Sequence, residues 1–222
     1  MSVSPASNGG IRAVLWDFGG VFTTSPFEAF NRYEAERGIP KDFIRGVNAT
    51  NPHDDAWAKM ERSDVDLEEF GRLFEAETRA AGHAIHGGEI LPLLAGDLRP
   101  EMVEALNRVR RRYKTACLTN NMRTGEGPAM MREPAKAAAI EAVMALFDAV
   151  FESSKVGIRK PEPGFYQVAC EELGIAPDEA VFLDDLGINL KPAAALGMTT
   201  IKVTSAEQAL ADLEALLGLP LR

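Results

Sequence analysis

The sequence predicts an α/β fold built on a parallel sheet that carries helices on both faces. This prediction rests on the order of the apolar and amphipathic stretches along the chain. Short apolar and β-branched runs alternate with amphipathic stretches over most of the 222 residues, which is typical of parallel strands covered on both sides. The exception is the segment 24–95, where only helix signals occur. We therefore expect a helical segment inserted after the first strand.

Five strands and the helices between them follow from this alternation. The strands are expected at 11–16, 114–119, 148–153, 180–184 and 199–203. The amphipathic stretches lie at about 101–112, 135–147, 162–173, 188–196 and 205–217. Parallel strands end at one edge of the sheet, so residues that follow different strands are expected to meet there.

The helical segment begins with a capping signature. Ser25 is expected to be an N-cap, Pro26 the first helical residue, and Glu28 the partner that closes a capping box. Gly38 is expected to end this helix. A second signature, Asp66-Leu67-Glu68-Glu69, precedes an apolar stripe of Leu67, Phe70, Leu73 and Phe74, and more helix is expected around 54–62. The sequence thus predicts a core at 1–23 and 96–222 with a helical subdomain at 24–95.

Composition restricts the classes of partner. Hydrophobic residues make up 46% of the chain and the formal net charge is -9, which allows a large core and disfavours nucleic acids and anionic membranes as partners. No apolar run approaches the ~18 residues of a membrane span. The first ten residues look like a loose tail and lack the features of a signal peptide. Cys117 and Cys170 are expected to be free buried thiols, so a cytoplasmic location is expected.

Chemically active residues follow four of the five strands. Asp17 comes after the first strand and is followed by Gly19 and Gly20. The second strand ends in Thr119-Asn120-Asn121, the third is followed by Gly157-Ile158-Arg159-Lys160-Pro161, and the fourth ends in Asp184-Asp185 with Asn189 beyond. Three carboxylates, a hydroxyl and an ammonium group are therefore expected at one sheet edge.

These groups form a consistent set for phosphate chemistry. Repulsion among three carboxylates calls for a cation, and Mg²⁺ prefers oxygen ligands of this kind. Lys160 and Mg²⁺ would also relieve the repulsion between an attacking carboxylate and a phosphoryl group. Taken alone, each residue has a simpler interpretation, since Asp185 fits a helix cap, Lys160 an exposed lysine and Thr119 a turn. Their order along the strands favours the functional interpretation.

The four stretches resemble the four motifs of the haloacid dehalogenase superfamily across nearly the whole chain. Within this superfamily, their sequences are most similar to the phosphatase-like N-terminal domain of soluble epoxide hydrolases and related bacterial chains. The four stretches read WDFGGVFTTSP, LTNN, GIRKPEPGFY and VFLDDLGINLKPAAALGM. The resemblance implies a Rossmann-like sheet and a helical cap at 24–95. It also implies a hydrolase that acts on a small phosphorylated metabolite with Mg²⁺.

Residue roles come from the same resemblance. It implies Asp17 as nucleophile, Thr119 on the phosphate and Lys160 as the charge-balancing group. Asp17, the Gly19 carbonyl, Asp184 and Asp185 would hold the metal, with Asp184 as a direct ligand and Asp185 in support. Gly20, Asn120 and Asn121 are expected at the substrate, and Asn189 is expected to orient the last loop.

Gly19 departs from the family pattern. Most phosphatases of this superfamily have an aspartate there, which protonates the leaving oxygen and then activates water. The glycine retains the carbonyl and lacks the acid, a loss that typically costs ~10²–10⁴-fold in rate.

Three functions stay open on this basis. The first is a phosphatase that favours leaving groups needing little protonation, or one whose acid is a histidine of the cap (His53, His83 or His86). The second is a 2-haloacid dehalogenase, which needs no acid at 19, although the acid pair Asp184-Asp185 and the absence of Tyr at 19 oppose it. The third is a phosphate-binding or regulatory protein of low activity. A homodimer through the cap is also left open.

Three further features have simple explanations. Arg108, Arg110, Arg111, Arg112 and Lys114 are expected to be a solvated helix end. Met130-Met131 lies in a long connection that is expected to be a surface loop. Phe27, Phe30 and Tyr33 are expected in the core of the cap, with a substrate pocket as the alternative.

Overall fold

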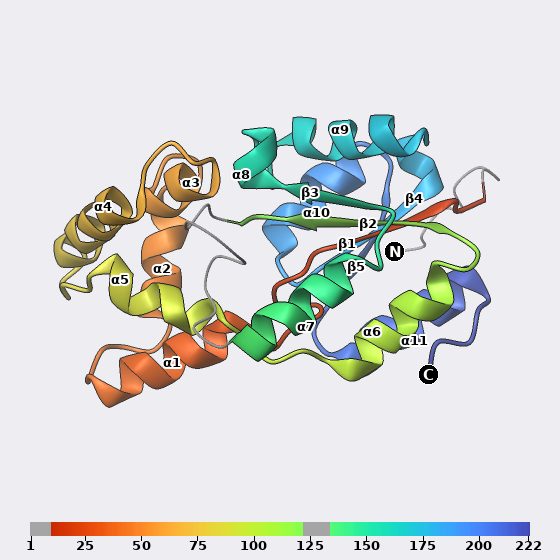
Figure 1. Cartoon of the computed structure of the whole chain (residues 1–222). Helices are drawn as coiled ribbons and strands as arrows, with labels where there is room; N and C mark the ends of the chain where they lie inside the picture. Colours follow the sequence, from red (N-terminus) through yellow and green to blue (C-terminus); the bar gives the residue numbers. More distant parts are fainter. Residues whose placement is uncertain (1–9, 122–133) are drawn as a thin grey trace, which may run out of the picture.

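The computed structural model describes residues 10–121 and 134–222, so most of the expected N-terminal tail and the Met130-Met131 connection lie outside the described residues. Its five strands are β1 (Ala13–Trp16), β2 (Lys114–Thr119), β3 (Ala149–Glu152), β4 (Ala180–Asp184) and β5 (Thr199–Lys202). They pair in parallel in the order β3-β2-β1-β4-β5 (Figure 1). The α/β fold class predicted from the alternation of strands and helices is confirmed.

Strand register brings the functional ends of three strands together. Trp16 of β1 is the partner of Cys117 in β2 and of Leu183 in β4. The next residue of β1, Asp17, donates its backbone N–H to the Leu183 carbonyl at 2.8 Å. Asp17 therefore leaves the central strand beside Asp184.

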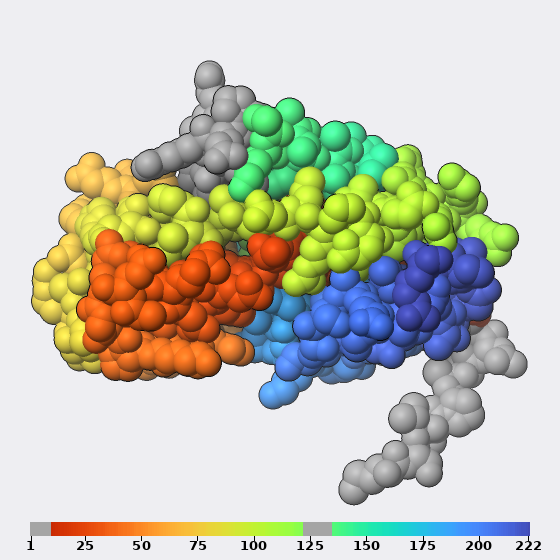
Figure 2. All heavy atoms as spheres, turned by 90° about the horizontal axis from the view of Figure 1, so that it is seen from below, coloured from red at the N-terminus to blue at the C-terminus, as the bar shows by residue number. Residues whose placement is uncertain are grey.

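Helices cover both faces of the sheet. One face carries α6 (Pro100–Val109), α7 (Pro134–Met144) and α11 (Ala206–Leu217). The other carries α9 (Pro163–Leu173) and α10 (Gly187–Ala195). Figure 2 shows α6 (yellow-green) beside α11 (blue) on the first of these faces. Successive residues of β1 point alternately into the two cores, Val14 and Trp16 into one and Ala13 and Leu15 into the other.

A group of helices between β1 and β2 forms a third core beside the carboxyl ends of the strands (Figure 1). Its elements are α1 (Pro26–Glu36), α2 (Phe43–Thr50), α3 (Ala56–Glu61), α4 (Leu67–Ala80), α5 (Gly87–Ile90) and the 3-10 helix η1 (Leu91–Leu94). Aromatic rings dominate this core, where Phe70 packs against both Trp57 and Phe74. We call residues 24–95 the helical insertion. Its role as a cap and its boundaries as a subdomain stay predictions.

Helix-end signals were correct to different degrees. Asp66 caps α4, because its Oδ1 accepts the Glu69 N–H at 2.8 Å. Pro26 is the first residue of α1, but the Ser25 side chain makes no capping hydrogen bond, so the expected capping box is wrong. Gly38 follows the end of α1 with φ +67°. Leu67 is 41% exposed, although Phe70 and Phe74 of the same stripe are buried.

The sequence analysis did not predict several short elements. The helix α2 in the insertion, the single turns α5 and α8 (Ser153–Val156), and the 3-10 helices η1 and η2 (Pro177–Glu179) were not expected. Most of them are too short to display an apolar period. In the described parts of the chain, no helix has the length and apolar character required to cross a bilayer.

We predict that Thr78→Val destabilises the insertion. The buried Thr78 hydroxyl accepts the Ile85 N–H at 3.0 Å and donates to the Phe74 carbonyl at 2.9 Å, so valine leaves a buried N–H without a partner. The free energy of unfolding should fall by about 1–3 kcal/mol in urea denaturation. Thr50→Val is the matched control, because the exposed Thr50 hydroxyl donates to the Gly46 carbonyl. Equal effects of the two substitutions would contradict the prediction.

Candidate active site

Lys160 lies at the centre of the predicted site and is only 1% exposed. Its ammonium group is 2.8 Å from Asp17 Oδ1 and 2.7 Å from Asp184 Oδ2. Burial by itself would lower the pKa of Lys160, but the two carboxylates outweigh burial and raise that pKa above its usual value. The simple interpretation of Lys160 as an exposed lysine is therefore wrong.

Asp17 presents one constrained and one unpartnered oxygen. Oδ1 accepts hydrogen bonds from Lys160 and from the Phe18 backbone N–H at 2.7 Å. No group in the described ranges donates to Oδ2. Burial raises the pKa of Asp17 well above its usual value, Lys160 opposes this shift, and Asp184 and Asp185 reinforce it. The carboxylate thus depends on Lys160 for its charge.

Asp184 is fully buried and saturated with donors. Oδ2 contacts Lys160, Oδ1 accepts the Leu186 N–H at 2.7 Å, and Asn189 Nδ2 lies 3.1 and 3.0 Å from the two oxygens. Asn189 is in turn held by Tyr166, whose hydroxyl donates to its carbonyl at 2.7 Å. Asp184 therefore holds Lys160 in place. Asp184 and Asn189 together hold the loop after β4, which is the place where Asn189 was expected to act.

Asp185 has the opposite character. It is partly exposed, and within 10–121 and 134–222 no other residue donates a hydrogen bond to its side-chain oxygens. Burial and the neighbouring Asp184 raise its pKa to about 6, against the opposing effect of Lys160. Ligand oxygens of Asp17, Asp184 and Asp185 lie within 4.8 Å of one another. This cluster fits a hard divalent cation, because two of its carboxylates retain an unpartnered oxygen.

The two glycines after Asp17 differ in their surroundings. Gly20 has φ +74°, and a Cβ built there would lie 2.3 Å from Asp185 Oδ2, so the turn requires glycine. Gly19 is exposed, and, apart from its two chain neighbours, no atom of the described residues lies within 4 Å of a Cβ built there. The site has space for the missing acid at 19 but none for a side chain at 20.

Residues 119–121 lie at the expected place, although two of the side chains point to other partners. Thr119 is buried at the sheet edge. Asn120 Nδ2 donates to Glu61 Oε2 at 3.1 Å and to the Lys160 carbonyl at 2.9 Å, while its Oδ1 accepts the Lys160 N–H at 2.9 Å. Asn121 is hydrogen-bonded to Glu152 and Ser154. Their substrate-binding role stays a prediction.

A cavity of 1010 Å³ joins the sheet edge to the helical insertion. Asp17, Gly19, Thr119, Lys160 and Asp185 line its core side. Apolar side chains line much of the remaining wall, among them Phe18, Phe27, Phe30, Trp57, Ile140 and Met144. Gly20 and Asp184 are not among the lining residues, and Tyr33 belongs to the core of the insertion.

The three histidines do not line this cavity. His83 packs edge-on against Phe43, and His86 accepts the Gly88 N–H at the start of α5. A histidine as replacement acid is therefore not supported.

The sequence analysis missed several lining residues, and two of them pair with each other. Glu61 at the end of α3 and Arg159 next to Lys160 form an ion pair at 2.6 Å, with 16% and 12% of their side chains exposed. Arg159 stands within the stretch that contains Lys160, but nothing in the sequence marks Glu61. The pair connects the insertion to the core at the wall of the cavity.

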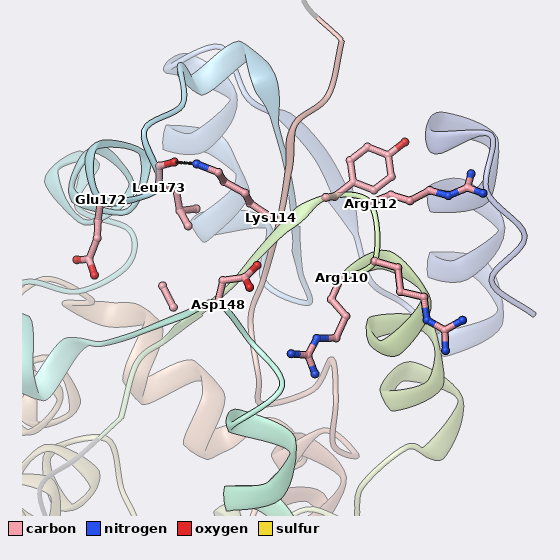
Figure 3. Close-up of a pocket in the computed structure, with 9 residues that line it drawn as sticks. Arg110, Arg112, Lys114, Asp148, Glu172 and Leu173 are labelled. Carbon is pink, nitrogen blue, oxygen red and sulfur yellow. Dashed lines mark hydrogen bonds between the residues drawn. The ribbon is translucent and has the colours of Figure 1, made fainter.

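A second depression of 510 Å³ lies at the opposite end of the sheet, among Arg110, Arg111, Arg112 and Lys114 (Figure 3). Figure 3 shows the guanidinium groups of Arg110 and Arg112 pointing away from each other. Lys114 donates to the Leu173 carbonyl at the end of α9. These cations do not converge on one point, which agrees with a solvated helix end.

Comparison with known proteins places the chain among hydrolases. Residues 11–197 match the family of haloacid dehalogenase-like hydrolases. The chain is 36% identical over 95% of its length to acyl-CoA dehydrogenase family member 10 and 28% identical over 94% to bifunctional epoxide hydrolase 2, both from Mus musculus, of which it covers 19% and 39%. It is 27% identical to phosphatase MT3486 of Mycobacterium tuberculosis, with 89% of each chain covered.

Solved structures show the same fold. A HAD family enzyme from Bacteroides thetaiotaomicron, in complex with magnesium and inorganic phosphate, matches with a TM-score of 0.58, 21% identity, and 92% and 99% of the two chains covered. L-2-haloacid dehalogenase from Xanthobacter autotrophicus matches with a TM-score of 0.57, 19% identity, and 92% and 82% covered. Because one neighbour is a dehalogenase, the fold alone does not distinguish the two reactions.

We predict that Asp185→Asn stabilises the metal-free protein at neutral pH. Folding raises the pKa of Asp185 from 3.8 to about 6, so the folded state binds more protons than the unfolded state between these values. The resulting stability is present below pH 4 and is lost as the pH rises to 6. Relative to wild type, Asp185→Asn should gain about 1–2 kcal/mol over this range, after allowance for partial exposure.

Urea denaturation in a chelator at pH 4 to 7 measures this difference. Asp178→Asn is the control, because Asp178 is exposed. A difference between wild type and Asp185→Asn that does not change with pH would contradict the prediction.

Proposed function

This chain belongs to the family of haloacid dehalogenase-like hydrolases, and we propose that within this family it is a Mg²⁺-dependent phosphatase. Its substrate is a small phosphate monoester or acyl phosphate, and the intermediate is a phosphoaspartate on Asp17. One observation carries the proposal. Asp17 has one oxygen held by Lys160 and the other unpartnered, in a cavity also lined by Thr119 and Asp185.

The first step uses the unpartnered oxygen of Asp17. Oδ2 attacks phosphorus, a P–O bond to Asp17 forms, and the P–O bond to the leaving group breaks with its electron pair on the leaving oxygen. Lys160 keeps Asp17 ionised in its buried position, and the Phe18 N–H orients the carboxylate. Thr119 donates to a phosphoryl oxygen. Water then attacks the phosphorus, the P–O bond to Asp17 breaks with its electron pair on Oδ2, and the proton of the water passes to the released phosphate or to solvent.

We assign the metal ligands from the hydrogen-bond partners that each carboxylate oxygen already has. When bound, Mg²⁺ neutralises phosphoryl charge and orients the group for in-line attack. The Asp17 carboxylate, the Gly19 carbonyl and Asp185 would hold the ion directly, while Oδ2 of Asp17 stays available for attack. Asp184 takes the supporting role, because Lys160, Leu186 and Asn189 already engage its oxygens. This reverses the roles that the family resemblance implied for the acid pair.

The leaving group follows from Gly19 and from the cavity. Without an acid at 19, the leaving oxygen departs as an anion or takes its proton from water, which favours acyl, anomeric or aryl phosphates. The apolar wall formed by Phe27, Phe30, Trp57 and Met144 favours a leaving group with an apolar part. Cys117 and Cys170 are free thiols, which agrees with the proposed cytoplasmic location.

The two alternatives are less well supported. Displacement of halide needs no divalent cation, whereas Lys160 pairs only with Asp17 and Asp184 and leaves the third carboxylate of the cluster, Asp185, without an ion pair among the described residues. Gly19 favours the low-activity phosphate-binding protein, but a binding protein has no use for a nucleophile kept ionised by a buried lysine.

We predict that Asp17→Asn abolishes phosphate release. The variant keeps the size of the side chain and removes the nucleophile, so turnover of acetyl phosphate and p-nitrophenyl phosphate with Mg²⁺ should fall about 10³-fold or more. Release of inorganic phosphate is the measurement, and near-ultraviolet circular dichroism checks the fold. Turnover in Asp17→Asn equal to that of wild type would exclude Asp17 as nucleophile. Halide release from 2-chloropropionate without metal would favour the dehalogenase.

We also predict that Gly19→Asp raises turnover of substrates with poor leaving groups. Apart from the chain neighbours of residue 19, no atom of the described residues lies within 4 Å of the new Cβ, and the added carboxyl supplies the missing proton. The kcat for glycerol 3-phosphate should rise about tenfold or more, while that for acetyl phosphate changes little. Gly19→Asn is the matched control, since the amide fills the same space without an acidic proton. Equal gains in both variants would show that acid catalysis is not the cause.

A further inference from the structure

Among residues 10–121 and 134–222, hydrogen bonds attach the helical insertion to the core at two places. At the chain crossings, Thr24 N–H donates to the Asp97 carbonyl at 2.9 Å, and Asp97 N–H donates to Thr24 Oγ1 at 3.1 Å. The second attachment joins α3 to α8, which lie next to each other in Figure 1. There Ser153 Oγ donates to the Glu61 carbonyl at 2.7 Å, and Arg159 Nη1 donates to the Pro52 carbonyl at 2.7 Å. The cavity has wall residues from both sides of this second attachment.

The ion pair between Glu61 and Arg159 is shielded at the second attachment. The two side chains are 16% and 12% exposed, whereas those of Glu69 and Arg72, another pair of the insertion, are 35% and 64% exposed. A shielded pair of good geometry loses much more when one partner is removed than an exposed pair does. The Glu61–Arg159 contact is thus a strong link between insertion and core.

Asn120 extends this link to Lys160. Its Nδ2 donates both to Glu61 Oε2 and to the Lys160 carbonyl, and its Oδ1 accepts the Lys160 N–H. One amide therefore binds both peptide groups of Lys160 and one carboxylate oxygen of the insertion. Glu61 can only accept from Asn120, so it selects the amide orientation that Lys160 requires.

We propose that Glu61, Arg159 and Asn120 are positioning residues that align Lys160 with Asp17 when the insertion lies against the core. Glu61 orients the Asn120 amide, Asn120 holds the backbone of Lys160, and the Lys160 ammonium then reaches Asp17 and Asp184. Movement of α3 away from α8 removes the carboxylate and loosens this alignment. The catalytic part of this inference rests on the proposed phosphatase, but the coupling between Glu61 and Lys160 does not.

Hydrogen exchange at the Lys160 backbone amide tests the coupling without any activity. That N–H is donated to Asn120 Oδ1, so its protection reports the state of the amide. In Glu61→Ala we expect about tenfold lower protection at Lys160. Glu61→Gln should lie between this variant and wild type, because its amide oxygen still accepts from Asn120. Glu69→Gln, in the exposed pair of the same insertion, is the matched control and should leave Lys160 unchanged.

Unchanged protection at Lys160 in a folded Glu61→Ala protein would overturn the proposal. So would an equal loss in the Glu69→Gln control, which would indicate a general loosening of the insertion. If Glu61→Ala does not fold, Glu61→Gln decides, and protection equal to that of wild type counts against the coupling.

Phosphate release provides the second readout. If Glu61 acts through Lys160, kcat for acetyl phosphate should fall about tenfold in Glu61→Ala with KM within about twofold, since the phosphate-binding groups stay in place. A change confined to KM would instead assign Glu61 to substrate binding and overturn the positioning role. Absence of turnover in the wild-type protein would refute the proposed phosphatase, and the exchange experiment would then decide the coupling alone.

Discussion

The contact of one buried ammonium group with two buried carboxylates is the constraint on which the site depends. Asp17 and Asp184 leave adjacent strands at the same level, and each would be strongly disfavoured as an anion in a buried position without the Lys160 charge between them. Lys160 in turn is stable in the interior only because both acids are present. The three groups are therefore interdependent, and Asn189, Leu186 and Asn120 keep them in register.

The turn after β1 contains two glycines that are under different steric constraints. Gly20 occupies a left-handed conformation against Asp185 and leaves no space for a side chain. Gly19 occupies open space, so the loss of an acid there is not enforced by packing. The carbonyls of the turn are available whichever residue stands at 19. A change from aspartate to glycine at this position therefore leaves the backbone carbonyls in place and removes one carboxyl group.

The helical insertion lines one side of a cavity whose other side carries Asp17, Lys160 and Asp185 of the core. It supplies aromatic side chains to the cavity wall and, through Glu61, one polar contact with the residues that support Lys160. Under the proposed phosphatase activity, this arrangement separates recognition of the leaving group from the chemistry at phosphorus. The amide of Asn120 is turned toward Lys160 and Glu61, and it therefore holds the backbone of Lys160 in place.

The sequence by itself determined the order of strands and helices, the residues at the strand ends and the absence of an acid at 19, because these depend on local pattern and spacing. Only the tertiary structure decided which partner each residue has. In the folded protein, Lys160 is buried and Asp184 is hydrogen-bonded to Asn189, whereas Asp185 has no such partner among the described residues. The Asn120 amide is turned toward Lys160, and the histidines do not line the cavity. The tertiary structure also brought Glu61 to Arg159 across 98 positions of sequence. Such contacts depend on register and on packing between distant elements, and residues distant in the chain carry no local signal of their partners.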